Sequence, residues 1–326
     1  MRKRTQFTLL AFFVLLCALA VMVYLRQKAP PEAARLLPES DAIVFLNLKP
    51  LRAATHFDRN PVTPSASYQQ FIDATGIVFE RDLDQAAFAL HQMPDPNGPN
   101  GPMAFSEVFE GRFDSARLTR YLASLATSQE NYAGRTIYSI PSEARTFRVA
   151  VLGYDMIAAS NMPTPEQIHS ILDRTRAAAS PFAGSSLLSA RFNDIPLLSK
   201  DAWAIGHIGL PFAQNGKITV LGLELPMPEQ TTFVASVHYT NALHLRIDQI
   251  ARSDAEATQT THSLNTLLNL FRSVQQAQQP VPRTPEDFAV RQFIDSITIE
   301  QHKDRAVLNA TLPADTLKRL TTSNQP

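Results

Sequence analysis

The sequence is poor in cysteine and glycine. Its one cysteine, Cys17, lies inside an apolar N-terminal run, so the rest of the chain has no disulfide, no cysteine-ligated zinc site and no thiol nucleophile. Only 11 glycines occur in 326 residues, which leaves little for phosphate-binding loops. The GxSxG, SxxK, HExxH, GxxxxGK[ST] and GxGxxG motifs are also missing. These absences exclude the catalytic and cofactor sites that short motifs encode, while a triad assembled from distant residues stays open.

The chain also lacks an excess of charge of either sign, because 30 basic and 30 acidic residues balance. The balance hides an asymmetry. Residues 1–28 hold five basic residues and no acid, so the remainder has 25 basic and 30 acidic residues. A mildly acidic body lacks the clustered Lys and Arg that displace counterions from nucleic acid. We therefore expect no nucleic-acid partner. The 44% apolar content is that of a globular protein.

One long apolar run stands out at the N-terminus. Residues 7–25 contain only Thr8 and Cys17 as mildly polar residues, and as a helix they span roughly 28 Å, close to the hydrocarbon core of a bilayer. Basic residues precede and follow the run. This predicts an uncleaved, single-pass membrane anchor, with residues 1–6 as a cytoplasmic tail and the body outside. A cleaved signal peptide using Ala18-Leu19-Ala20 and a buried core helix are the alternatives.

Changes in amino-acid composition along the chain divide the body into segments. Residues 26–35 contain Pro30-Pro31 and indicate an extended linker. Residues 41–48 predict a strand that is apolar on both faces and so lies inside a sheet. Proline-rich or glycine-rich breaks follow at 93–103 and 278–285. We expect an α+β fold in two units or halves, 36–180 and 181–326.

Between these breaks a ββα pattern recurs: a strand or hairpin, a capping residue, then an amphipathic helix. The pattern predicts helices after Asp114, after the capping box that starts at Thr164, and from about Asp254. The other elements that it predicts are a strand over 106–113, hairpins over 145–159, 231–250 and 297–312, and a closing helix with Leu317 and Leu320.

Two short stretches occur twice. Leu36-Leu37-Pro38-Glu39-Ser40-Asp41-Ala42 resembles Leu197-Leu198-Ser199-Lys200-Asp201-Ala202, and Gln70-Phe71-Ile72-Asp73 recurs as Gln292-Phe293-Ile294-Asp295. Internal duplication explains both echoes if the copies carry unequal insertions. The alternative is that ββα units recur in unrelated α+β proteins.

Candidate site residues are few, and each has a structural explanation beside the functional one. Glu166, His169 and Asp173 share one face of a predicted helix, as metal ligands would or as a solvated polar face would. His238 and His244 flank a hairpin turn and pair across strands, with or without a metal. The remaining histidines are His56, His91, His207, His262 and His302.

Three other features carry less information. Carboxyl pairs such as Glu107 and Glu110, or Asp248 and Asp254, fit acid–base chemistry only if they converge in one cleft. The single tryptophan, Trp203, is expected in the core rather than on a ligand platform. Asn309-Ala310-Thr311 is an N-glycosylation triplet, which matters in a eukaryote alone. We therefore assign no catalytic, cofactor-binding or metal-binding residue and expect no cofactor.

The stretch from Leu36 to Leu46 resembles the "LLPxDAxxFL" first strand of uncharacterised bacterial proteins that have a basic start, one membrane helix and a Pro-containing linker. Ser40 is an extra residue relative to that pattern. The resemblance implies a place in the bacterial envelope, at the inner membrane with the body facing the periplasm or cell exterior. It implies nothing about substrate.

The function that we expect is non-enzymatic binding or scaffolding in the envelope. The chain would bind the lipid bilayer through residues 7–25 and a protein or envelope component through its body. An enzyme drawing on His169, Asp173, His207 or His238 would need at least two of these side chains in one pocket. A carrier of a hydrophobic ligand would need an apolar cavity between sheet and helices.

Overall fold

The computed structural model describes most of the body. It covers residues 29–59, 63–98, 100–142, 145–176, 184–196, 199–207, 231–240, 242–278 and 285–313. It also covers the backbone of 213–214, 217–220 and 223–226, and four helical residues near the N-terminus, Phe13, Leu15, Leu16 and Leu19.

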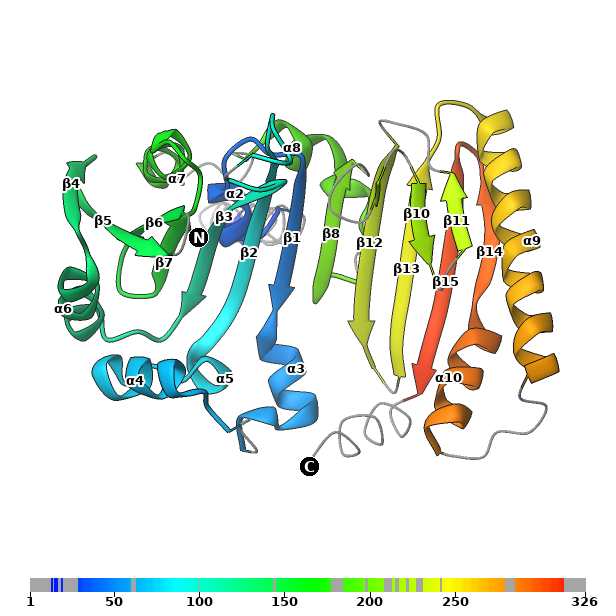
Figure 1. The fold of residues 1–326 in the computed structure, drawn as a ribbon, viewed down its shortest axis with the longest axis horizontal. Coiled ribbons are helices and arrows are strands. Elements are labelled where there is room, and N and C mark those ends of the chain that lie inside the picture. The colour runs from blue at the N-terminus through cyan, green and yellow to red at the C-terminus, as the bar shows by residue number, and fades with distance from the viewer. Residues whose placement is uncertain are drawn as a thin grey trace, which may run out of the picture.

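A single antiparallel sheet runs through the described residues, with twelve strands in the order β14-β15-β13-β12-β8-β1-β2-β3-β7-β6-β5-β4 (Figure 1). A small sheet of three strands, β9 to β11, accompanies it. The strands are β1 Ala42–Asn47, β2 Leu83–Gln92, β3 Met103–Gly111, β4 Ser128–Tyr132, β5 Arg135–Ser142, β6 Arg145–Val151, β7 Met156–Ser160, β8 Ala202–His207, β9 Ala213–Gln214, β10 Lys217–Val220, β11 Leu223–Pro226, β12 Thr232–Tyr239, β13 Ala242–Ile250, β14 Thr298–His302 and β15 Arg305–Pro313.

Near the centre of the sheet lies the antiparallel pair β1–β8, whose residues are about 160 positions apart in sequence. The pair is closed at both ends by matching backbone hydrogen bonds, from His207 N to Asp41 O at 3.1 Å and from Asn47 N to Asp201 O at 2.6 Å. Gly206 allows the close approach, because a Cβ there would lie 2.5 Å from the Cβ of Ala42. From this centre each side continues with a hairpin, β2–β3 or β12–β13.

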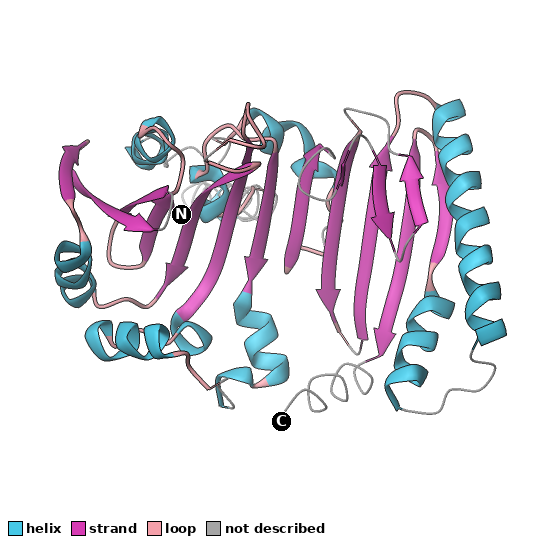
Figure 2. Ribbon diagram, in the orientation of Figure 1, coloured by secondary structure: helices cyan, strands magenta, loops and turns pink. Residues whose placement is uncertain are grey.

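Helices lie at both ends of the sheet and against one of its faces (Figure 2). Short helices α2 and α8 and helix α7 bury Leu36, Leu188 and Ile168 against the central strands, which forms the main core. The helices are α2 Glu32–Leu36, α3 Leu48–Thr55, α4 Ala66–Thr75, α5 Phe79–Asp82, α6 Ser115–Leu125, α7 Glu166–Arg176, α8 Ser186–Arg191, α9 Asp254–Gln278 and α10 Pro285–Ser296, with 3₁₀ turns at Phe57–Arg59 and Phe192–Asp194.

Helix ends follow local sequence signals. The Asp114 carboxylate accepts hydrogen bonds from the backbone N–H groups of Ala116 and Arg117, so α6 starts where the capping pattern predicts. Helix α4 ends at Gly76, whose φ of 74° is the left-handed conformation that glycine adopts without strain. Helix α7 buries Ile168 and Ile171, as its apolar stripe predicts.

The α+β class is confirmed, and so are the predicted hairpins, which appear as β6–β7, β12–β13 and β14–β15. The predicted strand at 41–48 is β1 and lies inside the sheet, paired on both sides. The long helix from Asp254 is α9, and the break at 278–285 separates it from α10. The predicted loop at 93–103 joins β2 to β3.

One prediction about secondary structure is wrong, and two strands were not predicted. Helix α2, Glu32–Leu36, buries Ala33, Ala34 and Leu36, although residues 32–35 were expected to end an extended linker. Pro31 stands before the first helical turn, where a missing N–H costs nothing, so the proline pair did not exclude a helix. Strands β4 and β5 were not predicted, because Ser128–Tyr132 is exposed and polar and shows no alternation.

Other predictions concern residues outside the described part of the chain. Most of residues 7–25 belong there, as do the division near residue 180, the copy of the first echo at Leu197 and Leu198, and the closing helix with Leu317 and Leu320. Among the described residues no helix combines the length and apolar character that a membrane span requires. The anchor and the two halves stay predictions.

Candidate ligand-binding face

The central strands are apolar on both faces, but only one face is fully buried. On the core face, Ile43, Phe45, Trp203 and Ile205 are 0–2% exposed. Their neighbours along the same strands, such as Val44 and Ala204, point the opposite way and are half-buried. A sheet with two apolar faces needs cover on both, so the second face needs an explanation.

We call this second surface the open face. It follows from the register, because residues directly opposite each other in antiparallel strands lie on one side of the sheet. Val44 pairs with Phe88 and Ala204, and Ala204 pairs with Ala235. Its central residues, all half-buried, are Val44, Leu46, Phe88, Leu90, Phe105, Phe109, Ala202, Ala204, Phe233, Ala235, Val237, Leu245 and Ile247.

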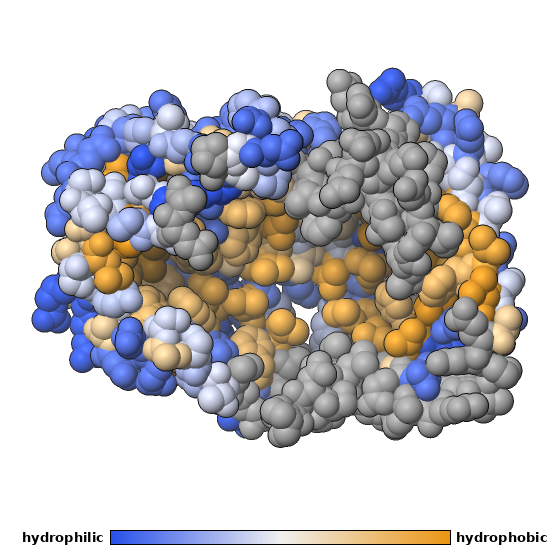
Figure 3. All heavy atoms as spheres, viewed as in Figure 1, coloured by the Kyte–Doolittle hydropathy of each residue, from blue (hydrophilic) through white to orange (hydrophobic). Residues whose placement is uncertain are grey.

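Helices cover the two ends of the open face. At one end, Leu118 and Leu122 of α6 pack with Tyr138, and Val149 and Ile157 lie against this cluster. At the other end, α9 reaches β14, where the hydroxyl of Thr258 donates to the side chain of Gln301 at 2.9 Å. In the middle of the view, Figure 3 shows a hollow with apolar side chains on its floor. Within the described residues, the middle of this face is a trough without a helix over it.

One carboxyl group interrupts the apolar floor. Glu107 pairs with Phe88 on β2 and Ala159 on β7, and Phe105 and Phe109 lie two positions away along β3. The rings of Phe88 and Phe109 meet edge to face at 5.8 Å. Burial raises the pKa of Glu107, because few waters remain to solvate the carboxylate. No hydrogen-bond or ion-pair partner for this carboxyl occurs among the described residues.

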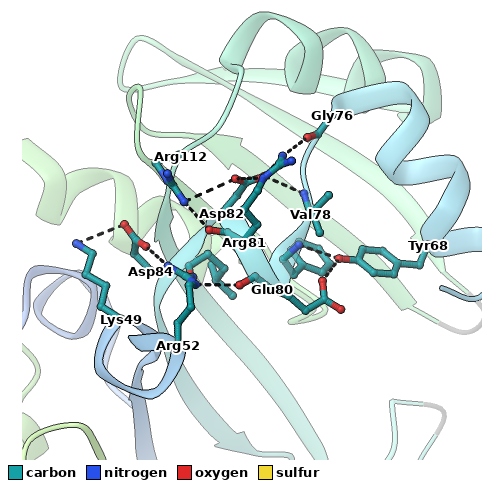
Figure 4. Close-up of polar contacts among 12 residues, drawn as sticks. Lys49, Arg52, Tyr68, Gly76, Val78, Glu80, Arg81, Asp82, Asp84 and Arg112 are labelled. Atoms are coloured by element: carbon teal, nitrogen blue, oxygen red, sulfur yellow. Dashed lines mark hydrogen bonds and ion pairs between the residues drawn. The ribbon is translucent and has the colours of Figure 1, made fainter. Parts of the chain in front are cut away.

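Charged groups at the rim of the sheet, in contrast, are matched (Figure 4). Asp84 at the end of β2 accepts from Arg52 of α3 at 2.9 Å and lies 3.3 Å from the ammonium of Lys49. Arg52 also donates to the backbone carbonyl of Leu83. Asp82 accepts from Arg81 at 2.6 Å. The network joins α3 and α5 to β2, which is a structural role.

The balance at Asp82 shows why this network is stabilising. Burial acts to raise the pKa of its carboxyl, but the bonds from Arg81 and from the backbone N–H of Val78, with the charge of Arg112, outweigh burial and lower it. Ion pairs and hydrogen bonds therefore favour the charged form here, whereas nothing described does so for Glu107.

The predicted face of Glu166, His169 and Asp173 packs on the β4–β5 hairpin. The His169 ring stacks on Tyr132 with centroids 3.8 Å apart, and its Nε2 lies 2.9 Å from Oε1 of Glu130. The Tyr132 hydroxyl donates to Asp173 at 2.9 Å. These contacts attach α7 to the β4–β5 hairpin at a solvent-accessible surface. His169 and Asp173 line one shallow pocket beside this hairpin, whereas His207 and His238 lie on β8 and β12, so only two of the four residues of the enzyme hypothesis come together.

His238 and His244 are direct cross-strand partners, as predicted, and their rings stack 4.7 Å apart. Nδ1 of His238 lies 3.0 Å from the Ser199 hydroxyl, and Nδ1 of His244 lies 3.3 Å from that of Thr311. Burial and the neighbouring His244 lower the pKa of His238. No group of three or more metal-ligating side chains occurs in the described part of the chain.

The other candidates have local roles. His91 is buried beside the Ser106 hydroxyl at 2.9 Å, and His207 lies 3.3 Å from that of Thr232. Asp248 binds Arg246 at 2.7 Å, while Asp254 begins α9.

The remaining predicted pair does not converge either. Glu110 and Glu107 are three positions apart on β3 and so point to opposite faces. Trp203 is in the core, 2% exposed, as predicted. Asn309, the first residue of the glycosylation triplet, is half-buried in β15.

Sequence reasoning missed the open face. Its one visible signal was the strand at 41–48, whose two faces are both apolar; the pattern does not say which of them other elements cover.

No protein-family model matches the sequence, and no curated protein matches it. Crystal forms III, I and IV of TP0453 are similar in fold, with TM-scores of 0.46, 0.44 and 0.45 and 11, 12 and 11% identity. The similarity covers 90, 91 and 89% of this chain and 99, 98 and 96% of those chains. So distant a similarity carries no argument about function.

Proposed function

We propose that this chain is a non-enzymatic binding protein that takes up an apolar ligand, such as the acyl chain of a lipid, on the open face. The observation that carries the proposal is the row of half-buried apolar residues in the middle of the sheet, with Val44, Phe88 and Ala204 at its centre. A contiguous apolar surface that stays partly accessible to solvent marks a binding site, because leaving it in water is unfavourable.

The cellular context that we propose rests on the sequence. Residues 7–25 anchor the chain in a bacterial inner membrane, and the body faces the periplasm or cell exterior, as the basic residues before the run favour. An anchored body with an apolar trough suits the handling of a membrane or envelope component.

We also propose that the body consists of two related halves with recurring ββα units. The matched strand order on the two sides of β1–β8 supports this, as do the paired hydrogen bonds of Asp41 and Asp201. Each of the hairpins β2–β3 and β12–β13 is followed by a helix, α6 or α9.

The binding proposal is tested by photolabelling. The full chain in nanodiscs of zwitterionic lipid is irradiated with an uncharged long-chain alcohol that carries a diazirine on its chain, and labelled peptides are mapped by mass spectrometry. We expect labels on peptides that contain β1, β2, β8 and β12. Ala204→Glu, which puts a charge at the centre of the floor, should reduce this labelling at least about tenfold, since burying an unpaired charge is unfavourable.

Thr240→Glu, at the exposed β12–β13 turn, is the matched control and should label as the wild type does. Far-UV circular dichroism verifies that both variants fold. Labelling that is spread over the whole surface, or that Ala204→Glu leaves unchanged, would contradict the proposal. So would a dimer in solution that buries these peptides, because a second copy would then occupy the face.

A further inference from the structure

The carboxyl group of Glu107 lies among apolar residues on the open face and has no hydrogen-bond or ion-pair partner among the other described residues. Phe88 and Ala159 lie directly across from it, and Phe105 and Phe109 lie on either side along the strand. Its side chain is half-buried. Replacing the hydration of a carboxylate with phenylalanine and alanine neighbours is costly unless another group binds it.

The described residues supply no such group at this position. Three basic side chains at the rim of the sheet are engaged elsewhere: Lys49 and Arg52 pair with Asp84, and Arg81 pairs with Asp82. The other glutamate of β3, Glu110, points to the other side of the sheet and so does not lie beside Glu107. Burial alone raises the pKa of Glu107, with no counter-charge acting on it.

The neighbours of Glu107 are suited to a positive charge. A carboxylate forms strong charge-assisted bonds to an ammonium group, and phenylalanine faces attract cations when water is excluded. Three phenylalanines, Phe88, Phe105 and Phe109, surround the carboxyl on the same face. A hydroxyl headgroup would use the carboxylate but gain nothing from the rings.

We propose that the ligand of the open face is a cationic amphiphile, whose ammonium headgroup binds Glu107 and whose alkyl chain lies over β2, β1 and β8. This inference rests on the proposed function, since it requires a ligand in the trough, and it adds the chemistry of the headgroup. The charge of Glu107 and its ring neighbours select the positive head, while Val44, Leu46 and Ala204 contact the chain.

Two photoreactive probes of equal chain length test the proposal: a diazirine-bearing dodecylammonium and the corresponding dodecanol. Each is applied to the full chain in zwitterionic nanodiscs, and the yield on peptides spanning 83–111 is normalised to partition into empty nanodiscs. We expect the ammonium probe to label at least about tenfold more than the alcohol at equal occupancy of the lipid. Glu107→Gln should abolish this preference, whereas Glu110→Gln, the matched control on the opposite face, should retain it.

The outcomes separate the two proposals. If both probes label the trough equally in the wild type, or if Glu107→Gln keeps the preference, the headgroup assignment is wrong while the apolar site stands. If neither probe labels the trough, both are wrong. The wild-type comparison needs no substitution, so it decides the question even if Glu107→Gln does not fold.

Discussion

Trp203 allows a sharp test of the packing at the junction of β1 and β8. Its ring stacks on Phe45 at 5.3 Å and meets Phe192 edge to face at 5.6 Å, and the residue is 2% exposed. Its Nε1 is buried and has no hydrogen-bond partner among the described residues. Packing stabilises the fold here, and an unbonded N–H destabilises it.

The favourable packing of the Trp203 ring and the unfavourable burial of its N–H group predict different results for two substitutions. Trp203→Ala removes the whole ring and should lower the free energy of unfolding by about 3–5 kcal/mol. Trp203→Phe keeps an aromatic ring against Phe45 and removes the unbonded N–H, whose burial costs about 1–3 kcal/mol. The smaller ring loses packing of similar size, so we expect Trp203→Phe to change stability by less than about 1 kcal/mol.

Urea unfolding followed by far-UV circular dichroism measures both variants, since Trp203 is the only tryptophan and its fluorescence is lost with it. If Trp203→Phe is destabilised as much as Trp203→Ala, the indole N–H is bonded or the phenyl ring does not fill the site. Either result would refute the reasoning. A Trp203→Ala change below about 1 kcal/mol would place the residue outside the core.

Two further predictions concern charge. Asp248→Ala should lower the free energy of unfolding by about 1.5–3 kcal/mol in a urea titration, because the Arg246 guanidinium, 2.7 Å away, loses its buried partner. Arg305, 3.6 Å from Asp248, keeps Asp194 at 2.7 Å. The control is Asp304→Ala, because the Asp304 carboxylate is half-exposed and lies 3.7 Å from Arg305. This substitution should lower the free energy of unfolding by less than about 1 kcal/mol. Equal effects of the two substitutions would contradict the stabilising role of Asp248. Burial lowers the pKa values of His91 and His238 below the ordinary 6.5. As the pH falls, these histidines therefore take up protons in the unfolded chain before they do so in the folded protein. The free energy of unfolding should then decrease below about pH 6.5, by at most about 1.4 kcal/mol per pH unit for each histidine. Replacing both with Asn should flatten the stability curve between pH 6.5 and 5; a curve that stays steep would assign the loss to other groups.

Local signals in the sequence were sufficient for the hairpins and most helices. The hairpin over 145–159, the cap at Asp114 and the apolar stripe of α7 each depend on residues a few positions apart. Such patterns act through neighbouring backbone groups, so they can be read without knowing the rest of the fold.

Long-range pairing could not be read in this way. The β1–β8 contact joins residues about 160 positions apart, and nothing in either strand specifies that partner. The candidate site shows the same limit. Glu107 looked like half of a carboxyl pair with Glu110, and only the register reveals that the two point to opposite faces, with Phe88 and Ala159 around Glu107. The helical face of His169 and Asp173 was predicted, but its contact with β4 was not.

The sheet itself shows what an ordinary uncovered face would contain. On β13 and β15 the core face changes from apolar to polar, and Arg246 pairs with Asn309 there while its side chain is 37% exposed. Water thus selects polar residues on one side of the same sheet. The open face remains apolar through β1, β8 and β12, although no described helix covers it. The apolar floor is the surface that the proposed ligand would cover, and the unmatched Glu107 is the group that its proposed headgroup would bind.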